Sequence, residues 1–348
     1  MEFVKCGRPL ELDPVLDQFI RANGGLFTHS LQWIRFLSRW LGVENESFVA
    51  LSEGRPRAYL PILVKDGPLG KVANSSPFYG SNGGIIVDQE LTPEEQLATK
   101  ERMLMYLNEN ARDNALTCIV TNPLYQDQVF YETRFPFQFT DSRVGQLTPL
   151  PGTESELLDM YHSKTRNMIR KAQKSGVAVS RSPDPVDLAF LIRTHHQNME
   201  QIGGIPKEEA FFTKAFVELS DHLQLWLARL DGEPVAALLL FVTENVVEYF
   251  TPVVRAEYRS MQPLSLLIYD AMKSAVNDHR KWWNWGGTWR TQEGVYRFKE
   301  RWGTEDKPYQ YFIQTAYADA FRGSTKEALL ENYRYFYTIP FDALTRNH

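Results

Sequence analysis

A basic helix in the middle of the chain is the first feature whose residues could do chemistry. Arg166, Arg170 and Lys174 follow one another at helical spacing, so a helix would place them on one stripe. No acidic residue occurs between Asp159 and Asp184. Such a stripe suits a polyanion: the diphosphate of a nucleotide-linked or lipid-linked acceptor, the phosphates of coenzyme A, or the acceptor end of a tRNA. It also suits the solvated face of an ordinary amphipathic helix, and both interpretations stay open.

A second unusual stretch runs from Trp283 to Gly303, with the sequence WNWGGTWRTQEGVYRFKERWG. Its first part predicts a strand whose tryptophans, Trp285 among them, build core and the wall of a cleft. Gly286 and Gly287 then allow a sharp exit of the backbone past a ligand. Its last part, VYRFKERWG, predicts a short helix.

Composition describes a globular protein without special targeting. The chain has 348 residues, of which 43% are hydrophobic and 23% charged, which suggests about two domains. We find no membrane-spanning apolar run and no signal peptide, and Cys6 and Cys118 are too few for a disulfide framework or a metal quartet. We therefore expect a cytoplasmic protein without a metal. The net charge of −5 argues against general attraction to nucleic acid.

The first half predicts an α/β domain. Thr92 and Pro93 begin one of its helices, as cap and first-turn residue. The segment 148–159, with its proline, glycine and new helix cap, marks the expected boundary. The predicted organisation is an N-terminal domain at 1–150, a C-terminal domain at 151–320 and a helical tail at 321–348 that packs on the domains.

The second half predicts a mixed sheet flanked by helices. Asp231–Gly232 is a hairpin turn signal between two of its strands. In chain order we expect helices at 153–177 and 184–203, three strands within 223–254, a helix at 263–279, a strand at 281–287, a helix at 294–303 and a strand at 307–315.

This order of elements resembles the core of the GNAT acyltransferase superfamily, in which two central strands splay apart and the acyl donor lies in the gap. Ordinary acetyl-CoA-binding members have a glycine-rich loop at the helix that follows, where backbone N–H groups hold the pyrophosphate. The corresponding loop here, RAEYRSMQPLSLL at 255–267, contains no glycine. That departure argues against a standard small acetyltransferase.

Two motifs make the resemblance more specific. RNMIRKAQKSGVAV at 166–179 resembles the R-x-x-I-R-K-A-x-K-x-G-V helix of the Fem-type peptidoglycan aminoacyltransferases and related acyltransferases. YRFKERWG at 296–303 resembles their Y-x-F-K-x-x-F-G signature. A weaker match, FYGSNGGIIVD at 78–88, resembles their aromatic and glycine-containing loop. Together they imply tandem GNAT-like domains, and the absence of room for a long helical arm places the chain near the compact members.

The resemblance also implies roles for individual residues. It places Lys299 at the acyl carbonyl, where a cation stabilises developing negative charge, and Phe298 beside it as core or substrate wall. The base that deprotonates the amine stays open: Tyr249 on the central strand is one candidate, water or the substrate itself is another, and Tyr249 could also be part of the core. Binding of donor or acceptor is expected of Arg166, Arg170, Lys174, Arg259, Gln262, Ser265, Tyr79, Asn82, Trp285 and Gly287.

The expected function is an N-acyltransferase that forms an amide with an amine of a cell-envelope, sugar or small-molecule acceptor. The co-substrate would be acyl-CoA or aminoacyl-tRNA, with no tightly bound cofactor. We expect no membrane span, although a lipid-linked acceptor would require peripheral access to a membrane. The alternatives are a non-catalytic ligand-binding or scaffold protein with a degenerate GNAT fold, and a tRNA-dependent transferase in natural-product or protein modification.

Overall fold

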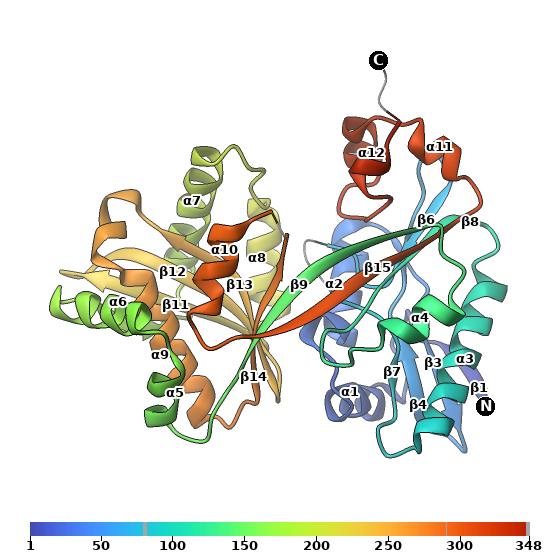
Figure 1. Cartoon of the computed structure of the whole chain (residues 1–348), viewed down its shortest axis with the longest axis horizontal. Helices are drawn as coiled ribbons and strands as arrows, with labels where there is room; N and C mark the ends of the chain where they lie inside the picture. The colour runs from blue at the N-terminus through green and yellow to red at the C-terminus, as the bar shows by residue number, and fades with distance from the viewer. Residues whose placement is uncertain (79–81, 290, 346–348) are drawn as a thin grey trace. The chain divides into compact units, whose positions relative to one another are not determined.

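The computed structural model describes residues 1–78, 82–289 and 291–345, and Figure 1 shows the whole chain. It forms two compact units: unit 1 is Met1–Val144 with Lys307–His348, and unit 2 is Gly145–Asp306.

The chain passes into unit 2 within β9 (Phe139–Pro149) and returns to unit 1 within β15 (Glu305–Thr315). The division predicted from the sequence differs from this at its C-terminal side, because residues 307–348 belong to unit 1. The physical reason is strand pairing: β15 pairs antiparallel with β8 (Asn114–Val120), with Ile313 opposite Cys118.

Unit 1 contains two sheets and the helices that cover them. One sheet has the order β1-β3-β4-β7, and the other runs β2-β5-β6-β8-β15 and ends on β9. Thr92 and Glu95 form a reciprocal capping box at the start of α3, as the sequence predicts for Thr92. The remaining bounds are β1 (Glu2–Lys5), β2 (Glu44–Asn45), β3 (Phe48–Ser52), β4 (Arg55–Leu60), β5 (Leu63–Lys65), β6 (Lys71–Asn74), β7 (Ile86–Val87), α1 (Asp13–Ala22), η1 (Phe27–His29), α2 (Leu31–Leu41), α3 (Pro93–Asn110), α4 (Gln128–Arg134), α11 (Ala318–Arg322), α12 (Lys326–Asn332) and η3 (Phe341–Ala343).

Unit 2 is a mixed sheet of order β10-β11-β12-β13-β14, with β9 beside β14. Asp231 and Gly232 both have positive φ in the turn between β11 and β12, as their sequence predicts. Its elements are α5 (Glu154–Met160), α6 (Ser163–Lys174), β10 (Ala178–Arg181), α7 (Pro185–Gln201), α8 (Glu209–Glu218), β11 (Leu223–Leu230), β12 (Glu233–Val242), β13 (Val246–Val254), η2 (Ala256–Met261), α9 (Pro263–Asn277), β14 (Trp282–Thr288) and α10 (Glu293–Glu300).

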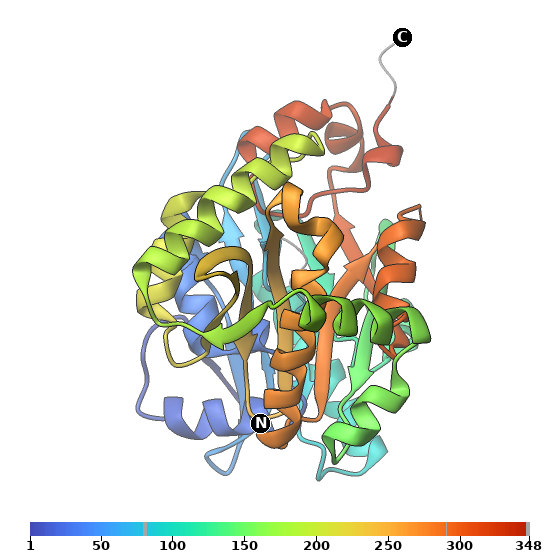
Figure 2. The ribbon, with the colours of Figure 1, turned by 90° about the vertical axis from the view of Figure 1, so that its left-hand side faces the viewer.

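Helices cover both faces of the unit 2 sheet. The core on one face joins α9 to alternating residues of β12, β13 and β14, and Figure 2 shows α6 lying across α9. On the other face, Phe211 of α8 packs against Phe250 of β13, which also contacts Phe241 of β12. Where a long arm would be inserted, α7 and α8 are joined by residues 202–208 alone.

Unit 2 departs from the sequence prediction in several places, among them the absence of β10 and η2 from the predicted elements. The single helix expected at 153–177 is two helices, since Tyr161 and His162 are extended and the His162 imidazole accepts a hydrogen bond from the N–H of Lys164 as the cap of α6. The break lets α5 and α6 pack on α9 separately. The sequence prediction also lacks α8 and β9.

Candidate acyl-transfer site

The two central strands of unit 2, β13 and β14, pair over only part of their length. β13 and β14 are parallel and pair only from Val246 opposite Trp282 to Glu248 opposite Asn284. Beyond these residues each strand continues without pairing to the other. At the same level Phe250 is bulged out of the β12–β13 ladder, because Leu239 faces Thr251 while Leu240 faces Tyr249. The two strands therefore diverge toward their carboxyl ends.

Polar side chains lie at the last pair of residues that joins the two strands. The Asn284 amide donates to Glu248 Oε2 at 2.7 Å, and Asn284 Oδ1 accepts from the N–H of Gly286 at 2.9 Å. Gly286 has φ +71°, and a Cβ at this position would meet no atom within 4 Å. The glycine is therefore required by its backbone conformation, and the space beside it is open.

Lys299 lies on α10 and is only 6% exposed. Its Nζ donates to Thr288 Oγ1 at 2.8 Å and to the carbonyl oxygens of Gly287 and Gly286 at 3.3 and 3.4 Å. Burial lowers the pKa of the ammonium from 10.5 to about 8, and no carboxylate in the described part of the chain offsets that shift. A buried cation held only by neutral acceptors is costly, and such groups concentrate at functional sites.

A residue that the sequence prediction missed completes the environment of Lys299. Gln146 of β9 is fully buried, and its Oε1 accepts from Thr288 Oγ1 at 3.3 Å. Its Nε2 donates to the carbonyl of Tyr296 on α10 at 3.2 Å. Because the Thr288 hydroxyl donates to Gln146, its lone pairs are directed to Lys299. Gln146 therefore positions both the helix and the hydroxyl that hold the lysine.

Aromatic rings pack between the diverging strands. Tyr249, the first β13 residue beyond the pairing, lies 4.9 Å from Trp285, the first on β14, measured between ring centroids. Trp285 is buried and donates its indole N–H to Thr148 Oγ1 at 2.9 Å. Phe298 is only half-buried and packs edge-on to Trp285 at 6.1 Å. Burial raises the pKa of Tyr249 well above its usual range, so at neutral pH the phenol keeps its proton and can donate a hydrogen bond but cannot act as a base.

The basic residues of α6 divide by what they touch. Arg166 donates to the carbonyls of Tyr161 and Leu158 at 2.5 and 3.4 Å, which holds the end of α5. Arg170 is exposed and donates to the Asn167 amide oxygen at 3.3 Å, while Lys174 is exposed near the end of the helix. A cavity of about 500 Å³ lies beside this face, lined by Leu158, Asp159, Arg166, Ile169, Arg170, Gln173 and Tyr269.

The start of α9 is built from side chains rather than glycines. Gln262, with φ +63°, precedes Pro263, and its Oε1 accepts from Ser265 Oγ at 3.3 Å. Gln262 Nε2 donates to the carbonyl of Arg259, whose guanidinium donates to Gln201 at 2.9 Å. Ser265 is buried and contacts Met168 of α6. Gln262 and Ser265 thus hold one another at the N-terminal end of α9.

In the glycine-containing loop 78–88 of unit 1, polar groups of the described residues form hydrogen bonds within the unit. Asn82 is buried, its amide donates to the carbonyl of Thr121 at 3.2 Å, and its own carbonyl accepts from Thr28 at 2.7 Å. A Cβ on Gly83 would lie 2.3 Å from the carbonyl oxygen of Ser75, so this glycine is required by close packing. The predicted ligand residue Tyr79 lies outside the described residues.

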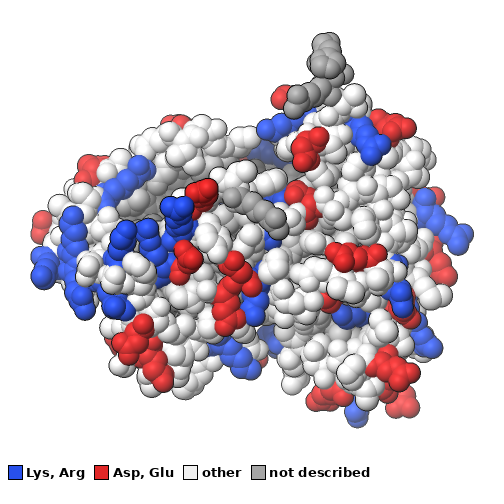
Figure 3. All heavy atoms as spheres, viewed as in Figure 1, with Lys and Arg blue, Asp and Glu red and all other residues white. Residues whose placement is uncertain are grey.

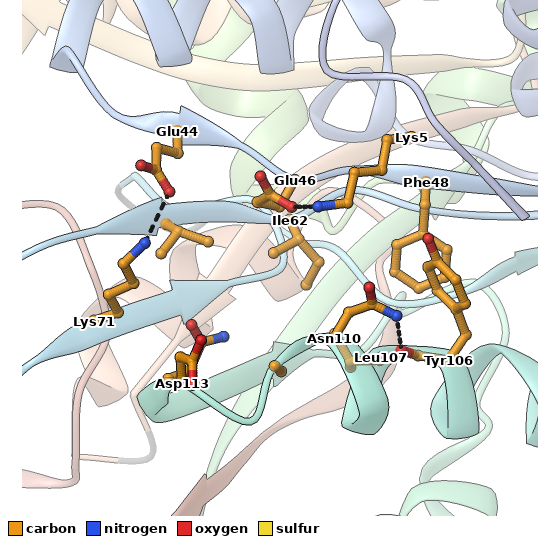
Figure 4. A pocket seen from close by; sticks show the side chains of 13 residues that line it. Lys5, Glu44, Glu46, Phe48, Ile62, Lys71, Tyr106, Leu107, Asn110 and Asp113 are labelled. Carbon is orange, nitrogen blue, oxygen red and sulfur yellow. Dashed lines mark hydrogen bonds and ion pairs between the residues drawn. The ribbon is translucent and has the colours of Figure 1, made fainter.

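Unit 1 has a pocket of its own, shown in Figure 4, with a volume of about 210 Å³. Lys5 pairs with Glu46, and Lys71 with Glu44 at 3.3 Å, across its upper rim. None of the predicted site residues lines it. With its lysines already paired, it offers no chemistry comparable to that around Lys299.

Two further properties of the described residues bear on the site. No three His, Cys, Asp or Glu side chains among them are placed to hold a metal ion. His195 Nε2 instead accepts a hydrogen bond from the N–H of Lys207, and His196 Nε2 lies 3.1 Å from the carbonyl oxygen of Lys207. No helix among them is long and apolar enough to cross a membrane.

Comparisons with known proteins agree with this geometry. Residues 161–300 match the model of the acetyltransferase (GNAT) domain family. No curated protein sequence matches the chain. Among solved structures, FemX is similar at a TM-score of 0.70 and 16% identity, over 90% of this chain and 97% of that one. L-PGS from Bacillus licheniformis is similar at a TM-score of 0.53 and 13% identity, over 85% of this chain and 90% of that one. A tandem GNAT protein from the clavulanic acid biosynthesis pathway is similar at a TM-score of 0.51 and 10% identity, over 90% of this chain and 98% of that one.

Proposed function

We propose that the chain is an N-acyltransferase with Lys299 at its centre, because residues 161–300 match the acetyltransferase (GNAT) domain family and the fold is similar to that of FemX. One observation carries this proposal. Lys299 is a buried ammonium held by Thr288 and two carbonyls, without a carboxylate among the described residues, on the helix that follows the splayed strand β14.

In the proposed reaction an amine attacks the carbonyl carbon of an activated acyl group. The C–N bond forms, the bond to the sulfur or oxygen of the donor breaks, and the proton of the amine leaves with the donor's thiol or hydroxyl. Negative charge develops on the carbonyl oxygen in the transition state. The Lys299 ammonium, desolvated and already oriented by Thr288, is the group that stabilises it.

The other side chains have supporting roles in this proposal. Trp285 and Tyr249 form a dry wall beside the acyl group, and Phe298 extends it. The carbonyl of Gly287 helps to orient Lys299. Because the Tyr249 phenol stays protonated, we propose it as a hydrogen-bond donor and not as the base that activates the amine.

We propose that a phosphate-bearing donor binds at the start of α9 and the neighbouring face of α6. Arg170 and Lys174 are exposed there, and Arg259 lies on η2. Arg166 has a mainly structural role, since its guanidinium already binds two carbonyls. The donor class is acyl-CoA or aminoacyl-tRNA, and the acceptor is an amine of a cell-envelope, sugar or small-molecule compound in the cytoplasm.

A donor screen tests this proposal. Thermal unfolding is measured with acetyl-CoA, longer acyl-CoAs and charged tRNA, and amide formation is then assayed with the donor that raises the melting temperature. Lys299→Met should bind that donor and lose amide formation by about 10²-fold or more, as for other single electrostatic groups. Unchanged turnover in this variant would remove Lys299 from the reaction. Absence of any donor shift would favour a non-catalytic binding protein.

A further inference from the structure

Charge on unit 2 is gathered on one side, around α6. Lys164, Arg170, Lys171 and Lys174 are all exposed on this helix. In Figure 3 Lys and Arg side chains crowd together over α6 at the left, whereas elsewhere on the visible face they are interspersed with acidic ones. The chain as a whole carries a net charge of −5, so this concentration opposes the overall balance. Such a face attracts a surface of phosphate groups.

Apolar side chains project from the loop that follows α7. Ile202 and Ile205 are 74% and 64% exposed, and they flank Gly203 and Gly204. Gly203 has φ +67°, so the loop turns sharply and holds both isoleucines away from the core. Two large exposed aliphatic side chains within four residues form a small apolar tip, which water solvates poorly.

The basic helix and the apolar loop belong to one surface. Arg259 of η2 donates to the Gln201 side chain at 2.9 Å, immediately before Ile202. On its other side η2 packs against α6. Figure 2 looks onto α6 and α7 from this side of unit 2. The surface therefore combines a cationic helix, a connecting segment that contributes Arg259, and an aliphatic tip.

We propose that unit 2 docks on an anionic lipid bilayer through α6, η2 and the loop 202–205. The cations meet lipid phosphates, and the isoleucines enter the boundary between headgroups and acyl chains. An RNA ligand would use the cations and would leave Ile202 and Ile205 in water. Since η2 directly follows β13, the docked surface lies at the end of the sheet where β13 and β14 diverge. Docking concerns where the protein works and not which bond it forms, so its test needs no turnover.

Vesicle co-sedimentation of the full chain tests the proposal, with phosphatidylcholine alone and with added phosphatidylglycerol. The wild type should bind the anionic vesicles, and binding should weaken with salt. Removing two near-surface cations that are not assigned to the donor, with Lys164→Ala and Lys171→Ala, should lower the partition coefficient by roughly 25-fold, at about fivefold for each cation. Ile202→Ser with Ile205→Ser should lower it by about tenfold while the dependence on salt is retained.

Matched changes elsewhere control for charge and surface polarity. Arg102 and Arg112 are exposed in unit 1, and Val129 and Met105 are 69% and 61% exposed there. Substitution of Arg102 and Arg112 by alanine, or of Val129 and Met105 by serine, should leave vesicle binding unchanged. Equal binding of neutral and anionic vesicles, or full binding by the isoleucine variant, would overturn the proposal. Binding of RNA without binding of vesicles would assign the surface to nucleic acid instead.

Discussion

Replacing Lys299 by methionine should stabilise the protein at neutral pH and destabilise it at high pH. In the folded chain burial lowers the pKa of this ammonium from 10.5 to about 8. A shift of that size corresponds to roughly 3 kcal/mol of unfavourable free energy at pH 7, where the lysine is charged in both states. Methionine has an unbranched apolar chain and carries no such desolvation cost.

The sign follows from proton binding. Between pH 8 and 10.5 the unfolded chain keeps the proton on Lys299 and the folded chain has lost it. Stability of the wild type therefore rises with pH across this window, and the penalty falls below about 1 kcal/mol at pH 10. Loss of the donor to Thr288 and two carbonyls costs the variant roughly 1–2 kcal/mol at every pH. The variant should thus be more stable than the wild type at pH 7 and less stable at pH 10.

Urea unfolding at the two pH values measures this difference, with tryptophan fluorescence as the probe because Trp285 and Trp302 lie in the core of unit 2. Lys174→Met is the matched control, since it removes an exposed amine from α6 and should give the same small difference at both pH values. If the difference between wild type and Lys299→Met is the same at pH 7 and pH 10, the desolvation argument for Lys299 is wrong.

Three further predictions concern neighbouring groups. Gln146→Glu places a carboxylate beside Thr288, the hydroxyl that binds Lys299, so NMR titration should show the pKa of Lys299 raised toward its ordinary value. Gln146→Leu should leave the pKa of Lys299 low. If the pKa does not rise in the Glu variant, the Gln146–Thr288 link is wrong. Arg166→Ala should destabilise the chain by about 1–3 kcal/mol in urea unfolding, since buried carbonyls at the end of α5 lose their donor; a change within ~0.5 kcal/mol would show that the contact is dispensable. Burial raises the pKa of Cys6 to about 12, so the native chain should resist iodoacetamide at pH 8 and react fully after unfolding, and rapid native labelling would refute its burial.

The sequence singles out Lys299 as a candidate but gives no sign of Gln146, the residue that holds Thr288 beside it. Lys299 could be found because it stands in a short motif on one helix. Gln146 is separated from Thr288 by 142 positions, and their contact exists only because β9 lies beside β14. No local feature of VGQLTP, residues 144–149, indicates whether the Gln146 side chain is a buried positioning group or part of a connecting segment. The order of the second-half strands was accessible, because alternation and turn residues are local properties.

The structure differs from the sequence prediction at the helix expected for residues 153–177 and in the contacts of Asn82, and both differences have physical reasons. The residues 153–177 have continuous helical character, and the break at Tyr161 and His162 comes from packing of two separate helices on α9. Asn82 looked suited to a ligand, yet its amide is used within unit 1. Pattern reasoning cannot tell whether a polar side chain faces a partner in the fold or one outside it.

The crossing of the chain through β9 and β15 has a consequence for biosynthesis. Unit 2 is a continuous segment, Gly145–Asp306, so all of its strands are available once residue 306 has left the ribosome. Unit 1 begins earlier but needs Tyr311 to Thr315 to pair with β8. The first-made part of the protein must therefore wait, with one edge of its sheet unpaired, until the later-made unit has been synthesised. Vectorial synthesis thus favours completion of unit 2 before unit 1.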